Sequence, residues 1–469
     1  MMITETVRTA VPTDRRPPRG LAMGGLAAAM FLVVLDGAMV NLAGSTIREG
    51  LGLTAAELTM VADGYLVAFA GLLLLGGRLA DVLGARRVFL AGMAWFVAAS
   101  VTCAMATGGA MLTTARVGQG IGAAVLLPAA LSIVLALYRT PAERARAMGI
   151  WGVVSGAASL LGVFLGGTLT QTLGWQAVFL APVPFGVIGA IVVWRAAPRT
   201  PGRPGRFDVL GAVTITVGIS ALALGMVLAA EAGWAAPGTF VGLAVGVAGL
   251  AAFVVVERRA AYPLVPLGVL GRRPVATANA VVFLLGGSLT GLFFFLPQYQ
   301  QDVLGMGPLA AGMTQVPVAV MIIVGAGLAP LLARRLGLTR ALPVGLVVLL
   351  GGFVWLTLDP TTSGFSASLL GAFLLIGSGL GLGLVSATAL GLRDSGEDES
   401  GLLSGLVNAA QQLGGAVGLA ALAGVAIGTA GGDVDFTTAF LGEVALVAIA
   451  LAISLLRTAR PALATFGTR

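Results

Sequence analysis

Long apolar runs alternate with short arginine-bearing loops along almost the whole chain, and this pattern limits the fold more than any other feature. A helix needs about 20 apolar residues to cross the hydrocarbon core of a membrane. Runs of that length recur about fourteen times, at roughly 21–44, 57–77, 88–107, 110–138, 145–170, 175–194, 208–230, 239–256, 275–299, 309–333, 341–358, 366–391, 401–428 and 436–456. Because helices satisfy every backbone group internally, the sequence predicts an all-α integral membrane protein.

The composition agrees with this prediction and excludes much chemistry. Of 469 residues, 58% are hydrophobic and 10% are charged, and 70 glycines permit close helix packing in lipid. The chain has no lysine and no histidine, and Cys103 is its single cysteine. It therefore lacks a Walker-A loop, a Schiff-base lysine, a histidine zinc site and an internal disulfide. We expect neither an enzyme, nor a metal site, nor a cofactor.

The distribution of arginine predicts the orientation of the chain in the membrane. Apart from Arg48 and Arg116, the arginines fall in the N-terminal segment, the C-terminal tail or an even-numbered loop. Opposite loops carry mainly acids, namely Glu49, Glu57, Glu231, Asp302, Asp359, Asp433 and Asp435. By the positive-inside rule, both termini and the even-numbered loops are cytoplasmic. The net charge of +7 thus reflects topology, and we expect no nucleic-acid partner. The rule does not explain the acidic loop 393–399.

A short internal repeat predicts two related halves. Residues 79–87 and 332–340 both read L-A-x-x-L-G-x-x-R, at the ends of the second and tenth spans. Matching loops predict parallel halves related by an axis along the membrane normal. We predict a cytoplasmic segment 1–20, a six-helix bundle 21–194, a linker with two additional spans 195–274, a second six-helix bundle 275–456 and a cytoplasmic tail 457–469.

Three charged residues interrupt apolar runs in the first half. Asp36 lies about 12 Å inside the first span, and Asp63 and Arg116 lie about 9 Å inside the second and fourth, at about 1.5 Å per residue. A charge inside the bilayer is a functional candidate because it costs a few kcal/mol. Burial favours a protonated carboxyl and a guanidinium favours the carboxylate, so Asp36 near Arg116 would bind and release a proton. The alternatives are a fixed ion pair for Asp36 and Arg116, and a water-facing acid for Asp63.

The loop after the second span carries a charged motif that consists of Gly77, Arg78, Asp81, Gly84, Arg86 and Arg87. Glycine at positions 77 and 84 would permit a tight turn, and the carboxylate would pair with a helix end or an arginine. Breaking and remaking these contacts would gate the cytoplasmic side. The alternative is that the charges only orient the protein.

Uncharged polar residues and glycines in the spans are further candidates. A mostly apolar cavity with few polar groups suits amphipathic organic ligands. The candidate lining residues are Asn41, Gln119, Gln298, Tyr299, Gln315, Asn408 and Gln412. Interhelical hydrogen bonding is the alternative for each of them. In the fifth span, Gly152, Gly156, Gly162, Gly166 and Gly167 permit either simple close packing or bending.

These motifs resemble those of the major facilitator superfamily, in its 14-span drug:proton antiporter branch. Residues 77–87 are similar to motif A, 116–124 to motif B and 406–415 to a signature of span thirteen. Leu35-Asp36 with Val40-Asn41 resembles the first-span motif, and the glycines of the fifth span resemble motif C. Departures from the pattern are Val163 in place of proline, Gln176 and Gln411 in place of arginine, and Asp63 in place of an uncharged polar residue.

The resemblance implies a fold of two six-helix bundles with two extra central spans. It implies a proton-coupled secondary transporter that exports lipophilic or amphipathic organic compounds, such as drugs and antibiotics, by alternating access. We expect a multi-pass monomer in the bacterial inner membrane that uses the proton gradient, with a small organic substrate, protons and lipid as its partners. The alternatives are a dedicated metabolite or natural-product transporter, and a membrane-embedded enzyme or receptor.

Overall fold

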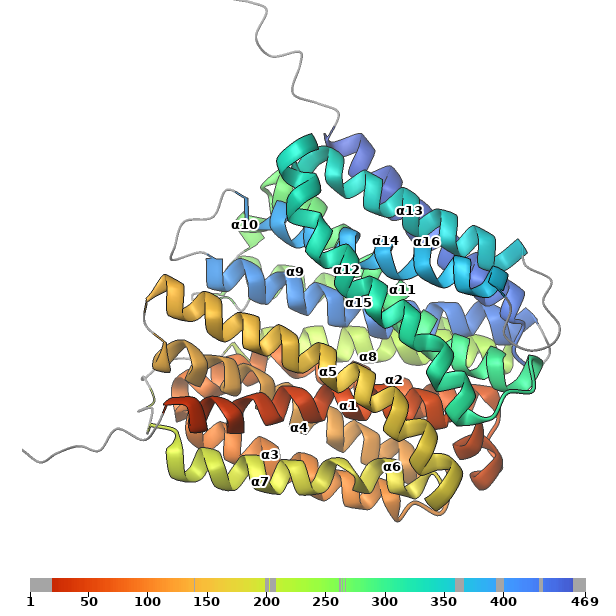
Figure 1. Ribbon diagram of the computed structural model, residues 1–469, viewed down its shortest axis with the longest axis horizontal. Coiled ribbons are helices and arrows are strands. Elements are labelled where there is room, and N and C mark those ends of the chain that lie inside the picture. Colours follow the sequence, from red (N-terminus) through yellow and green to blue (C-terminus); the bar gives the residue numbers. More distant parts are fainter. Residues whose placement is uncertain are drawn as a thin grey trace, which may run out of the picture.

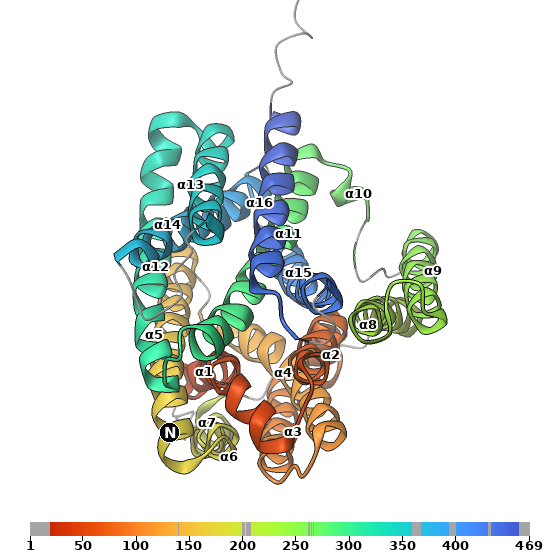
Figure 2. The same ribbon diagram turned by 90° about the vertical axis from the view of Figure 1, so that its right-hand side faces the viewer.

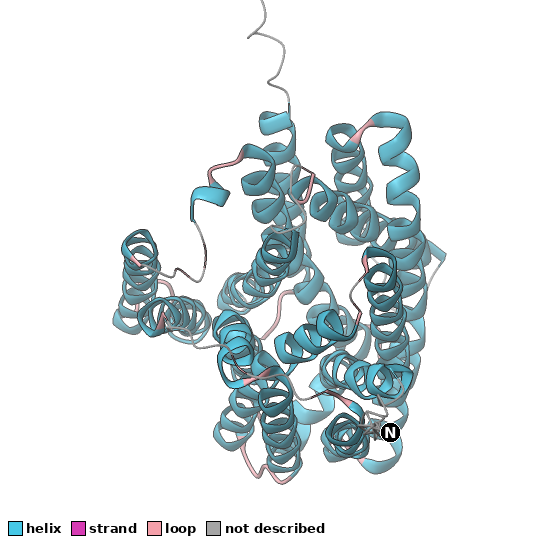
Figure 3. Cartoon of the chain, turned by 90° about the vertical axis from the view of Figure 1, so that its left-hand side faces the viewer, coloured by secondary structure: helices cyan, strands magenta, loops and turns pink. Residues whose placement is uncertain are grey.

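The computed structural model describes residues 19–138, 140–198, 202, 208–260, 263, 265, 267–358, 367–393, 400–429 and 433–458. Within these ranges long helices lie side by side and there is no β-strand (Figures 1 and 3). Fourteen of the described segments are long and apolar enough to cross a membrane, judged by length and composition. The prediction of an all-α membrane fold with about fourteen spans is confirmed.

The first half contains six spans. They are α1 (Arg19–Leu51), α2 (Ala55–Leu83), α3 (Ala85–Ala104), α4 (Gly109–Leu137), α5 (Pro141–Leu173), and the pair α6 (Gln176–Leu180) and α7 (Pro182–Ala196), which together form the sixth. Several helices run beyond the apolar segments that predicted them. Helix α2, for example, continues past residue 77 to Leu83, because charged residues remain helical once the chain has left the apolar core.

The extra spans and the second half follow. The extra spans are α8 (Val209–Ala232) and α9 (Pro237–Arg259), and the short α10 (Leu267–Leu270) leads to the second half. The second half consists of α11 (Arg273–Gln298), the π-helical η1 (Tyr299–Val303), α12 (Pro308–Leu336), α13 (Leu338–Leu358), α14 (Ala367–Gly391), α15 (Ser400–Thr429) and α16 (Phe436–Thr458).

Local sequence signals mark several helix starts. Thr54 and Glu57 form a capping box that begins α2, and Thr140 and Glu143 do the same for α5. Asp435 precedes α16, and its carboxylate accepts hydrogen bonds from the backbone N–H groups of Thr437 and Thr438. The hydrogen bond from the Thr438 hydroxyl lowers the pKa of Asp435, so this cap is an anion at neutral pH.

The internal repeat has the same backbone geometry in both halves. Gly84 ends α2 with φ +94° and donates its N–H to Ala80, and Gly337 ends α12 with φ +80° and donates to Ala333. Glycine is favoured at both positions because other residues rarely adopt positive φ. Gly77, by contrast, lies inside α2, so the prediction that it permits a turn is wrong.

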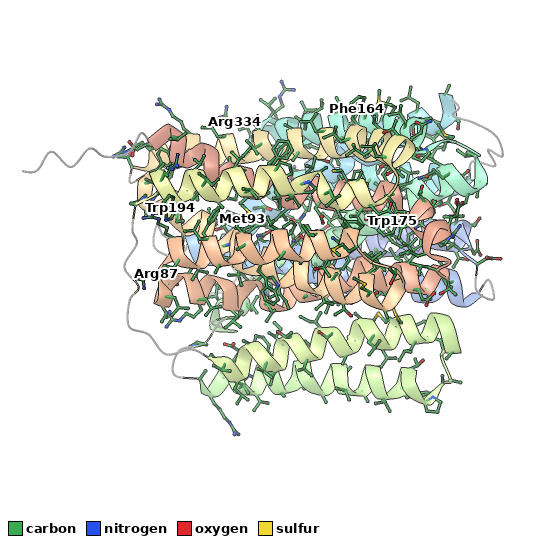
Figure 4. The ribbon with its side chains drawn as sticks, turned by 90° about the horizontal axis from the view of Figure 1, so that it is seen from below. Arg87, Met93, Phe164, Trp175, Trp194 and Arg334 are labelled. Atoms are coloured by element: carbon green, nitrogen blue, oxygen red, sulfur yellow. The ribbon has the colours of Figure 1, made fainter. Side chains whose placement is uncertain are left out.

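Helices α8 and α9 lie beside the main body, where α8 packs against α2 and α15 and α9 packs against α8 (Figures 2 and 4). The Thr216 hydroxyl donates to the Gly71 carbonyl of α2 at 2.9 Å. On the other side, Gly424 of α15 lies against the Met226 carbonyl, which a Cβ would approach to 2.8 Å. The extra spans therefore contact both halves at one seam of the molecule.

Two polar contacts join the halves where α1 ends, which we call the Arg48 end; the opposite end, where α2 ends, is the Arg87 end. Arg48 forms an ion pair with Asp302 of η1 at 2.9 Å. The Gln301 amide donates to the Leu42 carbonyl at 3.1 Å. Arg48 is an exception to the distribution of arginines along the chain, and the structure shows that it pairs with Asp302 of the other half.

Candidate functional site

An ion pair lies in the interior of the first half. Nη1 of Arg116 on α4 is 2.6 Å from Oδ2 of Asp36 on α1. The two side chains are 3% and 0% exposed, so neither charge has water to solvate it. Each charge therefore depends on the other. The sequence places Asp36 and Arg116 at similar depth in the membrane, and the structure brings their side chains together.

Polar neighbours complete the coordination of this pair. The Gln119 amide donates to Asp36 at 3.1 Å and to the Ser100 hydroxyl at 2.8 Å, and its oxygen accepts from Arg116 at 2.8 Å. The Cys103 thiol also donates to that oxygen, at 3.3 Å. Gln119 is fully buried and serves this network, a role that differs from the cavity lining predicted for it.

The guanidinium of Arg116 also contacts a backbone carbonyl and an aromatic ring of α2. Arg116 Nε donates to the Val61 carbonyl of α2 at 3.4 Å, and its Cζ lies 4.3 Å from the centre of the Tyr65 ring. Such cation–π contacts strengthen in a desolvated site. Sequence reasoning missed Tyr65, Ser100 and Cys103 because nothing in an apolar run reveals which face of its helix meets the ion pair.

Glycines of α5 bring the neighbouring helix close to Asp36. A Cβ on Gly162 would lie 2.7 Å from Ala38 Cβ, and one on Gly166 would lie 2.9 Å from Met39 Cα. These glycines therefore permit close backbone approach to α1 beside Asp36, as close packing predicts. Gly167 instead faces the second half, where its Cβ would lie 2.7 Å from Leu309 Cα. The packing at Gly152 and Gly156 lies outside the described part of the structure.

Asp63 does not join the ion pair. Its side chain on α2 is 3% exposed, and neither carboxylate oxygen has a hydrogen-bond partner among the described residues. The alternative of a water-facing acid is therefore wrong. Val67, one turn further along α2, packs against a cluster that includes Ile219 of α8 and Leu413 of α15. Asp63 thus lies beside the seam of the two halves and the extra spans.

The charged motif lies at the Arg87 end, where Figure 4 also labels Trp194. Arg86 donates to the Trp194 carbonyl of α7, which ties the start of α3 to the end of the sixth span. Asp81 is exposed and makes no hydrogen bond or ion pair within the described ranges. Gly202, from the segment after α7, lies against the Val82 carbonyl and Gly84. Arg78 lies on the last turns of α2 and Arg87 is exposed.

The remaining cavity candidates differ in burial and in hydrogen bonding. Gln298 and Gln315 are each 2% exposed; Gln298 donates to its own helix at Phe294, and Gln315 to Gln300 and Ala311. Their hydrogen bonds agree with the alternative of structural bonding. Tyr299 contacts the Phe436 and Phe440 rings at 5.7 and 5.6 Å. Of the other candidates, Asn408 is exposed, and Asn41 and Gln412 are partly exposed.

Nothing in the described ranges resembles a metal centre or a catalytic cluster. No group of three or more Cys, Asp or Glu side chains lies close enough to hold a metal ion in those ranges. The fold is that of a polytopic membrane protein with an ion pair buried in its first half.

The comparisons with known proteins give the family. The family model of the Major Facilitator Superfamily matches residues 26–419, so the chain belongs to this superfamily. It is 38% identical to the cephamycin export protein CmcT of Amycolatopsis lactamdurans, over 98% of this chain and 96% of that protein. It is 37% identical to the puromycin resistance protein pur8 of Streptomyces alboniger, over 90% and 84%. The prediction of a transporter rather than an enzyme is confirmed.

Solved structures share the fold at low identity. The POT family transporter PepTSo superposes with a TM-score of 0.70 at 14% identity, covering 94% of this chain and 97% of that one. A bacterial homologue of the human lysosomal transporter Spinster, in an inward-facing and unoccupied conformation, gives 0.68 at 15% identity, covering 94% and 97%. These likenesses confirm the transporter fold.

Proposed function

We propose that the protein is a secondary transporter that exports lipophilic or amphipathic organic compounds, antibiotics among them, in exchange for protons. The observation that carries the coupling is the pair of Asp36 and Arg116, buried at 2.6 Å. A carboxylate that alternates between this guanidinium and a water-filled path would take up a proton in one state and release it in the other. Export is supported by relatives named for cephamycin export and puromycin resistance.

The proposed mechanism is alternating access of the two halves. The six-helix units 21–194 and 275–456 would rock about a substrate site near the midplane, with 195–274 as the linker that carries the extra spans. The ion pair of Arg48 and Asp302 would close one end in the state described here. Asp63 is a second coupling candidate because it is buried beside the seam that must rearrange.

The decisive test uses reconstituted protein and puromycin as the probe. An imposed pH gradient should drive puromycin uptake into proteoliposomes through inside-out protein, and a protonophore should abolish it. Gradient-independent equilibration of puromycin would contradict proton coupling, and no movement of puromycin or lincomycin would contradict this substrate class.

A dedicated natural-product exporter is the second candidate. It is favoured by the identity of 38% along almost the full length of a cephamycin export protein. A panel of chemically unrelated antibiotics separates the two functions. Export of a single scaffold supports the dedicated exporter, and export of several supports a broad efflux pump.

The motif at the Arg87 end is proposed to act as a gate. Asp81→Asn should lower the transport rate about tenfold, because it would remove a charged contact that Asp81 forms in another state of the gate, and a cost near 1.4 kcal/mol changes an equilibrium tenfold. Membrane level should stay near normal, since Asp81 is exposed and its loss leaves no buried charge unpaired. Arg146→Gln, an exposed charge near the start of α5 that does not belong to the motif, is the matched control. An unchanged rate in Asp81→Asn would leave only a topological role for this acid.

The proposed orientation puts the Arg87 end in the bacterial cytoplasm, together with both termini. Ala235, in the loop between α8 and α9, is exposed, and so is Gly268 of α10. A cysteine at Ala235 should react with an impermeant maleimide in intact cells, whereas one at Gly268 should react only after permeabilisation. The native Cys103 is buried and should give no background. The opposite labelling pattern would show that the orientation in the membrane is the reverse of the one proposed.

A further inference from the structure

A second carboxyl group is buried inside the other half of the molecule. Glu443 of α16 is 1% exposed, and neither of its carboxylate oxygens has a hydrogen-bond partner in the described ranges. It lies seven residues after Phe436, or about 10 Å from the Arg48 end of the helix at about 1.5 Å per residue. An ionisable group at this depth is costly to keep without a function.

The walls around this carboxyl come from α11 and α15. A Cβ on Gly291 would collide with Glu443 Oε1 and with the Leu422 side chain. The missing side chain at position 291 is therefore what leaves room for the carboxyl. Ser288, one turn earlier on α11, lies near the carboxyl, yet its hydroxyl is also buried without a partner among the residues described. Two buried polar groups thus share one apolar site.

Among the described residues, no cation lies at the level of Glu443. Helix α16 packs against α11, α13 and α15, and Phe440 contacts Tyr299 of η1. Apart from Glu443, these elements carry few titratable or charged residues. Arg273 lies in α11 with Arg272 just before it, Arg340 lies in α13 and Arg457 lies in α16. Tyr299 and Asp302 lie in η1, and α15 has none. The arginines belong to the opposite helix ends, and Asp302 is paired with Arg48.

This environment differs from that of Asp36 in one respect. Asp36 has a guanidinium at 2.6 Å and is compatible with a negative charge. No counter-ion lies beside Glu443 in the described ranges, so this group is compatible with the membrane interior only as a neutral acid. A methyl group at Gly291 would already collide with the carboxyl, so the side of the carboxyl that faces α11 has no room for an organic cation. The cation that fits is a proton.

We propose that Glu443 is a second proton-binding site of this transporter, located in the carboxy-terminal half. Binding adds one proton to a carboxylate oxygen and makes the site neutral; release leaves one negative charge, which water must solvate. Deprotonation would therefore favour states in which α11 and α16 admit water. The inference builds on the proposed proton-coupled export and gives the second half a titrating carboxyl of its own, in addition to Asp36 and the candidate Asp63 in the first half.

The test reads protonation directly and needs no substrate. Infrared spectra of the purified protein in lipid nanodiscs, taken across a pH series, report the C=O absorption of protonated carboxyl groups. Wild type should show such a band that disappears as pH rises. Glu443→Gln should remove this component, and Asp36→Asn should keep it. Glu257→Gln is the matched control, because Glu257 is also buried but accepts a hydrogen bond from the Val265 N–H at 3.1 Å.

A second measurement ties the site to transport. In proteoliposomes, the number of protons moved per puromycin molecule should fall by one in Glu443→Gln. If Glu443→Gln folds poorly, Ser288→Ala supplies the test, since loss of the neighbouring hydroxyl should shift the pH at which the band disappears. If the Glu443 band titrates but the protein exports no substrate, the proposed function is contradicted and the proton-binding site is still supported. Identical spectra of wild type and Glu443→Gln at every pH, or a Glu443 band that never titrates, would overturn the proposal.

Discussion

Replacing Asp36 with asparagine should reduce pH-gradient-driven uptake of puromycin into proteoliposomes to the level of protein-free vesicles. Asparagine has nearly the same shape as aspartate and still accepts a hydrogen bond from Arg116, but it cannot bind a proton at neutral pH. Uphill movement requires that protons move with the substrate, so the variant should at most equilibrate puromycin. Puromycin binding should persist, which a fluorescence or calorimetric titration would measure.

A fixed structural ion pair is the competing explanation, and a double variant separates the two. Removing one partner of a buried pair costs about 3–5 kcal/mol because the other charge stays unpaired. Asp36→Asn with Arg116→Gln removes both charges, so it should restore thermal stability relative to the single variant. If the pair is only structural, gradient-driven uptake should return together with stability. If Asp36 carries the proton, the double variant should be stable and still uncoupled.

Replacing Gly414 with alanine should destabilise the second half more than any other single-methyl change on α15. A Cβ at this position would collide with the Phe283 carbonyl of α11, and a backbone carbonyl cannot move aside as a side chain can. Inserting a methyl group into a packed interior costs about 1–3 kcal/mol, and we expect the upper part of that range here. The thermal unfolding temperature of the purified protein should fall, together with its level in the membrane.

Gly405 of the same helix is the matched control, because a Cβ there would meet no atom within 4 Å. Gly405→Ala should leave the unfolding temperature unchanged or raise it slightly, since alanine favours a helix by about 1 kcal/mol over glycine. Equal losses in Gly405→Ala and Gly414→Ala would mean that helix flexibility, and not the approach of α11 and α15, explains the need for glycine.

Much of the architecture follows from the sequence because membrane insertion acts on the chain in one dimension. Length and hydropathy give fourteen spans, and the repeat at Gly84 and Gly337 marks equivalent loops of the two halves. Counting residues from the span ends also places Asp36 and Arg116 at one depth. These inferences need only the rise of a helix and the cost of moving charge into lipid.

The sequence could not decide which buried charges meet, because that depends on how each helix is rotated about its axis and on which neighbour it packs against. Asp36 and Asp63 lie at similar predicted depth, but only Asp36 faces Arg116. The rotation is set by close contacts between residues far apart in the chain, such as Gly162 against α1.

The same reasoning applies to the two groups that the sequence left without a role. Arg48 is an isolated arginine in the sequence, and the tertiary structure gives it Asp302 as a partner from the other half. Glu443 is the only carboxylate of its apolar run, but its significance depends on the space beside Gly291 and on the lack of a cation at that level in the described helices. The sequence by itself determined the class of fold and the depth of each charge; the packing of helices decided which charges are paired and which stay alone.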